Sequence, residues 1–162
     1  RVWQHMSLRP TSVEEYVEQV GRALATGRLP WTVRLRRPVN GLPVGSVVGT
    51  SSFLEVSVAD ARLEVGSTAY SPAVWGSAVN PEAKLLLLGH AFEVLKVGRV
   101  QLKTDVRNVR SQRAIARLGA TYEGTLRRYQ RRSDGSVRDT VMFSVTAEEW
   151  PTVRHGLRER LA

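Results

Sequence analysis

The pattern of hydrophobic and polar positions changes its period along the chain, and each change predicts a new element. In the first half, three stretches alternate apolar and polar residues as strands do: 31–36, 47–58 and 62–70. Ahead of them, Thr11 or Ser12 can cap a helix that runs to about Thr26. Gly27 and Pro30 then end that helix, so we expect one helix followed by a meander of strands.

The middle of the chain predicts a helix between two strands. Apolar residues recur at helical spacing over Glu82–Lys96, on the face formed by Leu85, Leu88, Phe92 and Leu95. Asn80 is a good N-cap for this helix, and Pro81 suits its first position. Arg99–Val106 alternates again and predicts a strand. Residues 62–106 therefore form a predicted strand–helix–strand unit with a right-handed crossover and parallel strands.

The last third predicts a helix, a hairpin and a closing helix. Asn108 starts the helix and Gly119 ends it. Asp134-Gly135 joins two alternating runs, which is a strong hairpin signal: Tyr122–Arg132 and Val137–Val145. A basic helix follows Trp150-Pro151. Because no repeat or linker interrupts the chain, we expect one α+β domain over 1–162.

Composition narrows the class of protein. The net charge is +9, and only 3 of the 24 basic residues are lysines. This balance favours a polyanionic or phosphorylated partner, or else reflects arginine-rich codon usage on a solvated surface. The absence of cysteine excludes disulfides, cysteine zinc sites and thiol nucleophiles. No apolar run approaches the roughly 20 residues of a membrane helix and no signal peptide is evident, so we expect a cytoplasmic protein without membrane contact.

Two segments carry residues suited to a phosphorylated ligand. Gly76, Ser77 and Ala78 have little side chain, and the backbone N–H groups of a loop and helix start point at one spot. This loop alone is weak evidence, because many helices follow a glycine for steric reasons. Asn108 and Ser111 follow the next strand, although Asn108 can also serve only as a helix cap. Since parallel strands end at one edge of a sheet, we expect both segments to open onto one cleft.

Several segments match the motifs of one protein family in order and spacing. These segments are Leu63-Glu64-Val65-Gly66, Trp75 to Lys84, Asn108 to Ala120, Glu123-Gly124-Thr125-Leu126 and Asp134 to Asp139. Over about 64–150 the chain thereby resembles the RimJ/RimL branch of the GNAT N-acetyltransferases. The resemblance implies the GNAT acyl-CoA N-acyltransferase fold, with a mixed central sheet, a βαβ cofactor-binding core and flanking helices. Two features depart from the family: Ala73 stands where Gln or Arg is usual, and the leading strand and helix are not evident before Arg1.

The resemblance also implies a reaction and its site. Acetyl-coenzyme A would donate an acetyl group to a primary amine, either a protein N-terminus or a small molecule. The acetyl and pantetheine arm would pair with the backbone of Ser67, Thr68, Ala69 and Tyr70. The pyrophosphate would bind the amides of Trp75, Gly76, Ser77, Ala78, Val79 and Asn80. Asn108 would bond to the pantetheine arm, and Ser111 would lie near the thiol as a candidate general acid.

Direct transfer also needs a group that takes the proton of the amine. Glu64 is the first candidate, because it lies on the strand leading into the cofactor cleft; alternatively it is an edge charge paired with an arginine. Asp139 could serve, although beside Arg138 it is more often half of a surface ion pair. His5 and His90 are further candidates, since histidine is the side chain most often used as a base near neutral pH, but His90 is expected to pack in a helix.

Two other functions stay open. A cofactor-binding or regulatory module with reduced turnover fits Ala73 and Gln130, which stands roughly where RimL enzymes place a Glu. A basic ribosome- or RNA-associated protein fits the net charge and one cluster: Arg127, Arg128, Arg131 and Arg132. Because no run of aromatic residues accompanies that cluster, nucleic acid is not the favoured partner. We expect no metal site, and an edge strand at the C-terminal hairpin would allow a homodimer by strand pairing.

Overall fold

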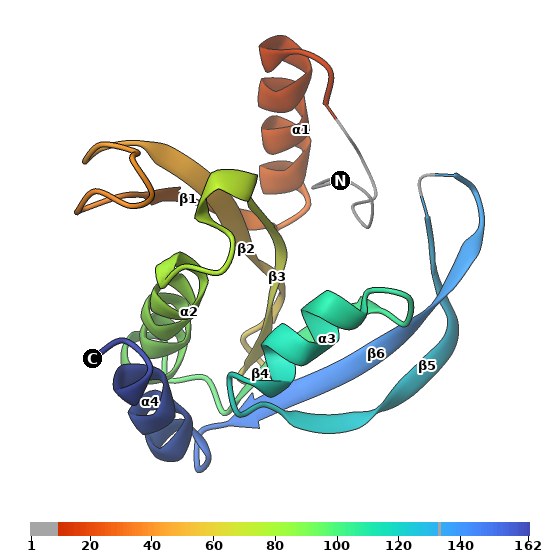
Figure 1. The fold of residues 1–162 in the computed structure, drawn as a ribbon. Coiled ribbons are helices and arrows are strands. Elements are labelled where there is room, and N and C mark those ends of the chain that lie inside the picture. The colour runs from red at the N-terminus through yellow and green to blue at the C-terminus, as the bar shows by residue number, and fades with distance from the viewer. Residues whose placement is uncertain (1–9, 133) are drawn as a thin grey trace.

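The computed structural model describes residues 10–132 and 134–162, and within them six strands form one sheet (Figure 1). The strand order is β1-β2-β3-β4-β6-β5, and every neighbouring pair is antiparallel except β3 and β4. The strands are β1 (Leu29–Arg34), β2 (Val47–Ser57), β3 (Arg62–Tyr70), β4 (Arg99–Asp105), β5 (Thr121–Arg131) and β6 (Val137–Thr146). This mixed sheet confirms the predicted fold class, including the parallel strand–helix–strand unit.

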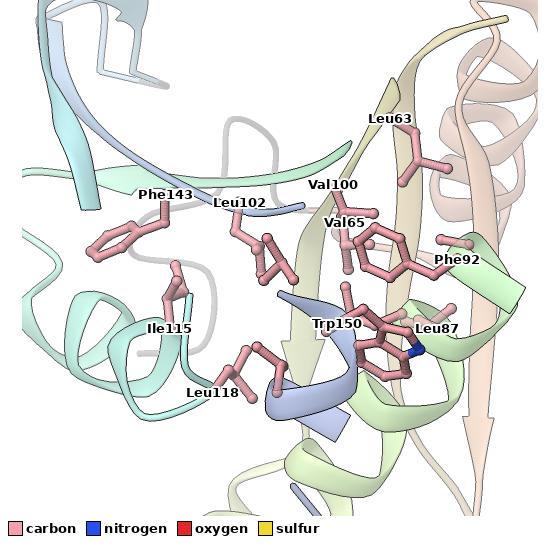
Figure 2. Close-up of a cluster of buried hydrophobic side chains, with 14 of the residues drawn as sticks. Leu63, Val65, Leu87, Phe92, Val100, Leu102, Ile115, Leu118, Phe143 and Trp150 are labelled. Carbon is pink, nitrogen blue, oxygen red and sulfur yellow. The ribbon is translucent and has the colours of Figure 1, made fainter. Parts of the chain in front are cut away.

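The main hydrophobic core lies between one face of the sheet and three helices (Figure 2). These helices are α2 (Val79–Gly89) with its π-helical continuation η2 (His90–Val94), α3 (Val109–Ala116) and α4 (Trp150–Glu159). Leu63 and Val65 of β3, Leu102 of β4 and Phe143 of β6 point into this core. Because side chains alternate along a strand, the residues next to these four face the opposite side of the sheet, here called the open face.

The first helix stands apart from this core. α1 (Val13–Ala25) begins at Ser12, whose hydroxyl accepts a 3.1 Å hydrogen bond from the Glu15 N–H, as a capping residue should. α1 contacts β1, lies away from α2, α3 and α4 (Figure 1), and buries none of its residues. Across the described ranges, no helix combines the length and apolar character needed to span a membrane.

Three local predictions were wrong. Asn80 is not the N-cap of α2, because the helix already begins at Val79, and the N-cap Ala78 makes no side-chain cap bond. Leu95 is 48% exposed instead of core-facing, because the π-helical turn of η2 shifts the residues after His90 out of helical phase. β1 lies two residues earlier than expected, since Leu35 leaves the strand and pairs its N–H with Ser46.

Strands β3 and β4 stay together over three residue pairs only and then separate. The last pair is Glu64 with Gln101. Beyond it, β3 continues along β2 as far as Tyr70, and β4 continues along β6 as far as Asp105. A β-bulge redirects β3 in this stretch, where Ser67 and the following residue lie opposite a single residue of β2. Ser67 has φ 46°, so this bulge is a specific distortion of the strand.

Candidate active site where two parallel strands separate

The separation leaves one edge of β3 without a strand partner. From Val65 to Tyr70, β3 pairs with β2 on one side but not with β4 on the other. Backbone N–H and C=O groups on such an edge need a partner, and an extended ligand with amide groups can supply one. The residues predicted to bind the pantetheine arm all lie on this edge strand: Ser67, Thr68, Ala69 and Tyr70.

The loop that follows β3 presents free amides at the start of α2. After the short helix η1 (Pro72–Val74), Gly76 has φ 75°, and a Cβ placed there would meet nothing within 4 Å. Among the described residues, the backbone N–H groups of Gly76, Ala78 and Asn80 have no hydrogen-bond partner. Free amides together with the helix dipole attract an anion. The predicted phosphate loop therefore leaves three backbone N–H groups available to a ligand.

The segment after β4 forms the second side of the site, opposite the loop that follows β3. Asn108 caps α3, because its Oδ1 accepts a 3.1 Å hydrogen bond from the Ser111 N–H, while no described residue accepts a hydrogen bond from its amide N–H groups. A buried ion pair holds the turn before it: Arg132 donates to both carboxylate oxygens of Asp105, at 2.6 and 3.0 Å. The Arg132 guanidinium thereby lowers the pKa of Asp105. Asp105 also accepts the Arg107 N–H, so its charge orders this turn.

A direct contact joins the loop after β3 to the start of α3. The Arg110 guanidinium lies over the Trp75 ring, 4.1 Å from its centroid. The indole Nε1–H of Trp75 donates a 3.1 Å hydrogen bond to the carbonyl of Tyr70, which anchors the ring at the end of β3. The loop after β3 and the start of α3 therefore lie side by side, as the strand–helix–strand topology predicted.

Removing the Arg110 side chain should uncover Trp75. An exposed cation–π pair contributes about 0.5–1 kcal/mol, so the Arg110→Ala variant should stay folded while acrylamide quenches Trp75 emission more strongly. Subtracting the signal of Trp75→Phe variants isolates this tryptophan. Arg113→Ala, on the same helix, is the control and should leave the quenching unchanged. Equal quenching of Trp75 in all three proteins would show that the contact does not form in solution.

Glu64 lies at the point where the strands separate. It is 4% exposed, faces the open side of the sheet, and has its Oε2 at 2.8 Å from the Lys103 ammonium. A Cβ on Gly66 would come within 2.5 Å of the Glu64 Oε1, so the carboxylate lies close over Gly66 and would have to shift if this residue carried a side chain. Burial raises the pKa of Glu64, and the Lys103 ammonium partly opposes this by stabilising the charged form.

Two β-bulges bring further side chains to the same place. We call the group the open-face cluster: Glu55, Glu64, Gln101, Lys103 and Tyr129. Glu55 has φ 48° in a bulge of β2, and this turns its carboxylate toward the ammonium of Lys103 and the amide of Gln101. A bulge of β5 at Arg128 does the same for Tyr129, whose ring centroid lies 5.1 Å from the Lys103 Nζ.

The members of the open-face cluster differ in how far they are buried. The side chains of Glu64 and Lys103 are 5% and 9% exposed, whereas that of Glu55 is 45% exposed. Burial alone would lower the pKa of Lys103, but its contacts with Glu55 and Glu64 outweigh burial and raise it. Lys103 is therefore a permanent cation beside Glu64. Sequence reasoning missed Glu55, Lys103 and Tyr129, because no local pattern marks them.

The other candidate residues have different surroundings. The alternative that Glu64 pairs with an arginine was wrong, since its partner is a lysine. Asp139 is not paired with Arg138; its Oδ1 accepts the Arg128 N–H at 2.7 Å and so supports the bulge of β5. His90 packs as expected, with its ring stacked on Phe53 at a centroid distance of 6.2 Å. His5 lies outside the described residues.

Comparisons with known proteins agree with this geometry. A family model described as an acetyltransferase (GNAT) domain matches residues 1–121. The N-acetyltransferase p20 of Bacillus licheniformis, itself uncharacterised, is 29% identical over 104 residues. That alignment covers 64% of this chain and 57% of p20, so the chain spans little more than half of its curated relative.

Solved structures give the same result. A protein from T. thermophilus described as an acetyltransferase is 41% identical, with a TM-score of 0.85. The match covers 99% of this chain and 82% of that protein. RimJ of Mycobacterium smegmatis, solved in complex with CoA-disulfide, shares the fold at 22% identity and a TM-score of 0.78, with 98% and 76% of the two chains covered. Because the family model matches well over half of the sequence, the chain belongs to the GNAT acetyltransferase family.

Proposed function

We propose that the protein transfers an acetyl group from acetyl-CoA to a primary amine. The observation that carries the proposal is the free edge of β3 ending at a loop of unpartnered amides, which suits a long ligand with amide groups and a pyrophosphate. A structural neighbour, RimJ, was solved with CoA-disulfide, which supports a CoA ligand for this fold. Acetyl-CoA supplies the acetyl group as a reactive thioester.

The residues on each side of the separation have distinct proposed roles. The β3 backbone at Ser67–Tyr70 orients the acyl arm, and one of its N–H groups stabilises the developing oxyanion. Within Trp75–Asn80, the unpartnered N–H groups of Gly76, Ala78 and Asn80 hold the phosphates, since those of Trp75, Ser77 and Val79 already donate to Pro72, Val74 and the Ser77 hydroxyl. The side-chain amide N–H groups of Asn108 hold the pantetheine arm from the side of α3. The Ser111 hydroxyl protonates the leaving thiolate. On the open face, Glu64 accepts the proton of the amine.

The acceptor and the setting of the protein are also proposals. A protein N-terminus or a small-molecule amine would reach Glu64 past Glu55 and Tyr129, the exposed members of the open-face cluster. The RimJ/RimL branch favours a protein N-terminus. We further propose a cytoplasmic location and a homodimer paired through β5, which is the outer strand of the sheet.

A charge placed in the phosphate loop should test the cofactor site. We expect wild type to bind acetyl-CoA with micromolar affinity in calorimetric titrations. Gly76→Asp should weaken this affinity at least tenfold, because a carboxylate would repel the phosphates, while Asp tolerates the φ of 75° better than most residues.

Gly27→Asp is the matched control for this titration. Gly27 has φ 77°, and a Cβ there also meets nothing within 4 Å, but it lies at the end of α1. The control should therefore bind acetyl-CoA as wild type does. If folded wild type bound no acetyl-CoA at millimolar concentration, the proposed function would be wrong. Equal losses in both variants would show that the loop is not the phosphate site.

A further inference from the structure

Lys84 is a buried ammonium group without a carboxylate beside it. It lies on α2, is 5% exposed, and donates hydrogen bonds to two hydroxyls, those of Thr68 at 2.8 Å and Ser51 at 3.2 Å. In the described part of the chain, no Asp or Glu lies within ion-pair distance of its Nζ. A buried charge that lacks a partner destabilises a fold unless something compensates for it. The two hydrogen bonds to hydroxyls do not by themselves explain why a lysine occupies this buried position.

The position of Lys84 suggests what compensates. Thr68 belongs to the bulge of β3, and Ser51 is the residue of β2 that faces this bulge. Lys84 also lies on the helix whose first amides form the proposed phosphate site, about 7–8 Å along the axis from Val79. The ammonium therefore lies against the bulge of β3, on the helix whose first amides would hold the phosphates. Because low-dielectric surroundings screen a buried charge little, it can act on an anion bound at the start of this helix.

The protonation state of Lys84 is poised near neutral pH. Burial lowers the pKa of Lys84 to about 7, and the carboxylate of Glu64 opposes this shift from the other face of β3. The buried hydroxyl of Tyr70, further along β3, stays neutral because burial raises its pKa. On α2 itself, the acidic residue of the first turn, Glu82, pairs with Arg37 at the surface. Ser51 and Thr68 do not titrate in this range. A tetra-anionic ligand above α2 would therefore favour the protonated form of Lys84.

We propose that Lys84 is a positioning residue for acetyl-CoA, which fixes the β3 bulge against α2 and takes up a proton when the anionic ligand binds. The proposal rests on the proposed function, because it takes acetyl-CoA as the ligand. It goes further in assigning a counter-charge to a residue that touches neither the phosphates nor the reacting atoms, and in coupling affinity to pH.

Calorimetry in two buffers of different ionisation enthalpy tests the coupling. Near neutral pH, wild type should take up a fraction of a proton per acetyl-CoA bound, and its Kd should rise several-fold as the pH increases through the pKa of Lys84. The 3′-phosphate of the ligand titrates near pH 6 itself, so the titrations are repeated with acetyl-3′-dephospho-CoA, which lacks it. The proton uptake and the pH dependence should persist with this second probe.

The Lys84→Met variant assigns the proton. It should unfold at the same temperature as wild type or higher, because the buried charge is gone, yet bind acetyl-CoA about tenfold more weakly at pH 6, without proton uptake and with a flat pH profile. Lys96→Met, at an exposed lysine, should keep the uptake. Wild-type binding without proton uptake would overturn the role of Lys84 alone, as would unchanged uptake in Lys84→Met. No binding by wild type would overturn the proposed function as well.

Discussion

Replacing Glu64 with glutamine is expected to lower kcat about 10²- to 10⁴-fold, the usual contribution of a general base. Glutamine keeps the shape of the side chain over Gly66 but cannot accept a proton. The Oε2 of Glu64 is buried and lies 2.8 Å from the Lys103 ammonium. The carboxylate would accept the proton of the amine beside this ammonium, directly or through one water. The KM for acetyl-CoA should change far less than kcat, because Glu64 lies on the opposite side of β3 from α2 and acts on Lys84 only through its charge.

The pH profile identifies the role of Glu64 more sharply than the rate does. Burial raises the pKa of Glu64, so wild-type activity should fall as the pH decreases through this raised value. This acidic limb of the pH–activity profile should disappear in Glu64→Gln. Short peptides with free N-termini serve as acceptors. Glu123→Gln is the control, since Glu123 also pairs with a cation, Arg99, at the closed end of β4. A loss below threefold in Glu64→Gln, or an equal loss in Glu123→Gln, would exclude Glu64 as the base.

The elements around the proposed cofactor site were predictable because local signals mark them. The loop after β3 combines small residues with Pro81 near the start of a helix, and α2 begins within two residues of the expected place. The hairpin of β5 and β6 follows from Asp134-Gly135 in the same way. Only the start of α2 differed, where the N-cap Ala78 makes no side-chain cap bond and the N–H groups of Ala78 and Asn80 have no partner among the described residues. A helix start without a side-chain cap is locally less stable, but its unpartnered N–H groups can bind a phosphate.

The open-face cluster was not predictable, because long-range pairing determines it. Glu55 and Arg128 both adopt positive φ in bulges, and neither residue type signals such a conformation. Each bulge depends on how its strand pairs with a neighbour, β2 with β3 and β5 with β6. Alternation alone would turn Glu55 toward the core face. Glu64 could be named as a candidate, but its partner Lys103 follows only from the register of β3 and β4.

Removing the partner of Glu64 should have the largest effect on stability. We expect Lys103→Met to lower the free energy of unfolding by about 3–5 kcal/mol at pH 8, because it leaves a buried carboxylate without a cation. Urea unfolding at several pH values measures this loss. A typical domain has a stability of about 5–15 kcal/mol, so the variant should remain folded but approach its limit. Lys96→Met, at an exposed lysine, should change the stability by less than about 0.5 kcal/mol.

The loss should depend on pH with a definite sign. Without Lys103, the pKa of Glu64 in the folded variant rises further above its unfolded value. Folded protein then binds a proton that unfolded protein releases, so the stability of the variant rises as the pH falls from 8 toward 5. Wild type gains less over this range, because Lys103 holds Glu64 ionised, and the difference between the two proteins should shrink. Adding Glu64→Gln to Lys103→Met removes the unpaired charge and should restore much of the stability at pH 8. A loss that stays constant with pH, or a double variant as unstable as Lys103→Met, would mean that Lys103 contributes packing only.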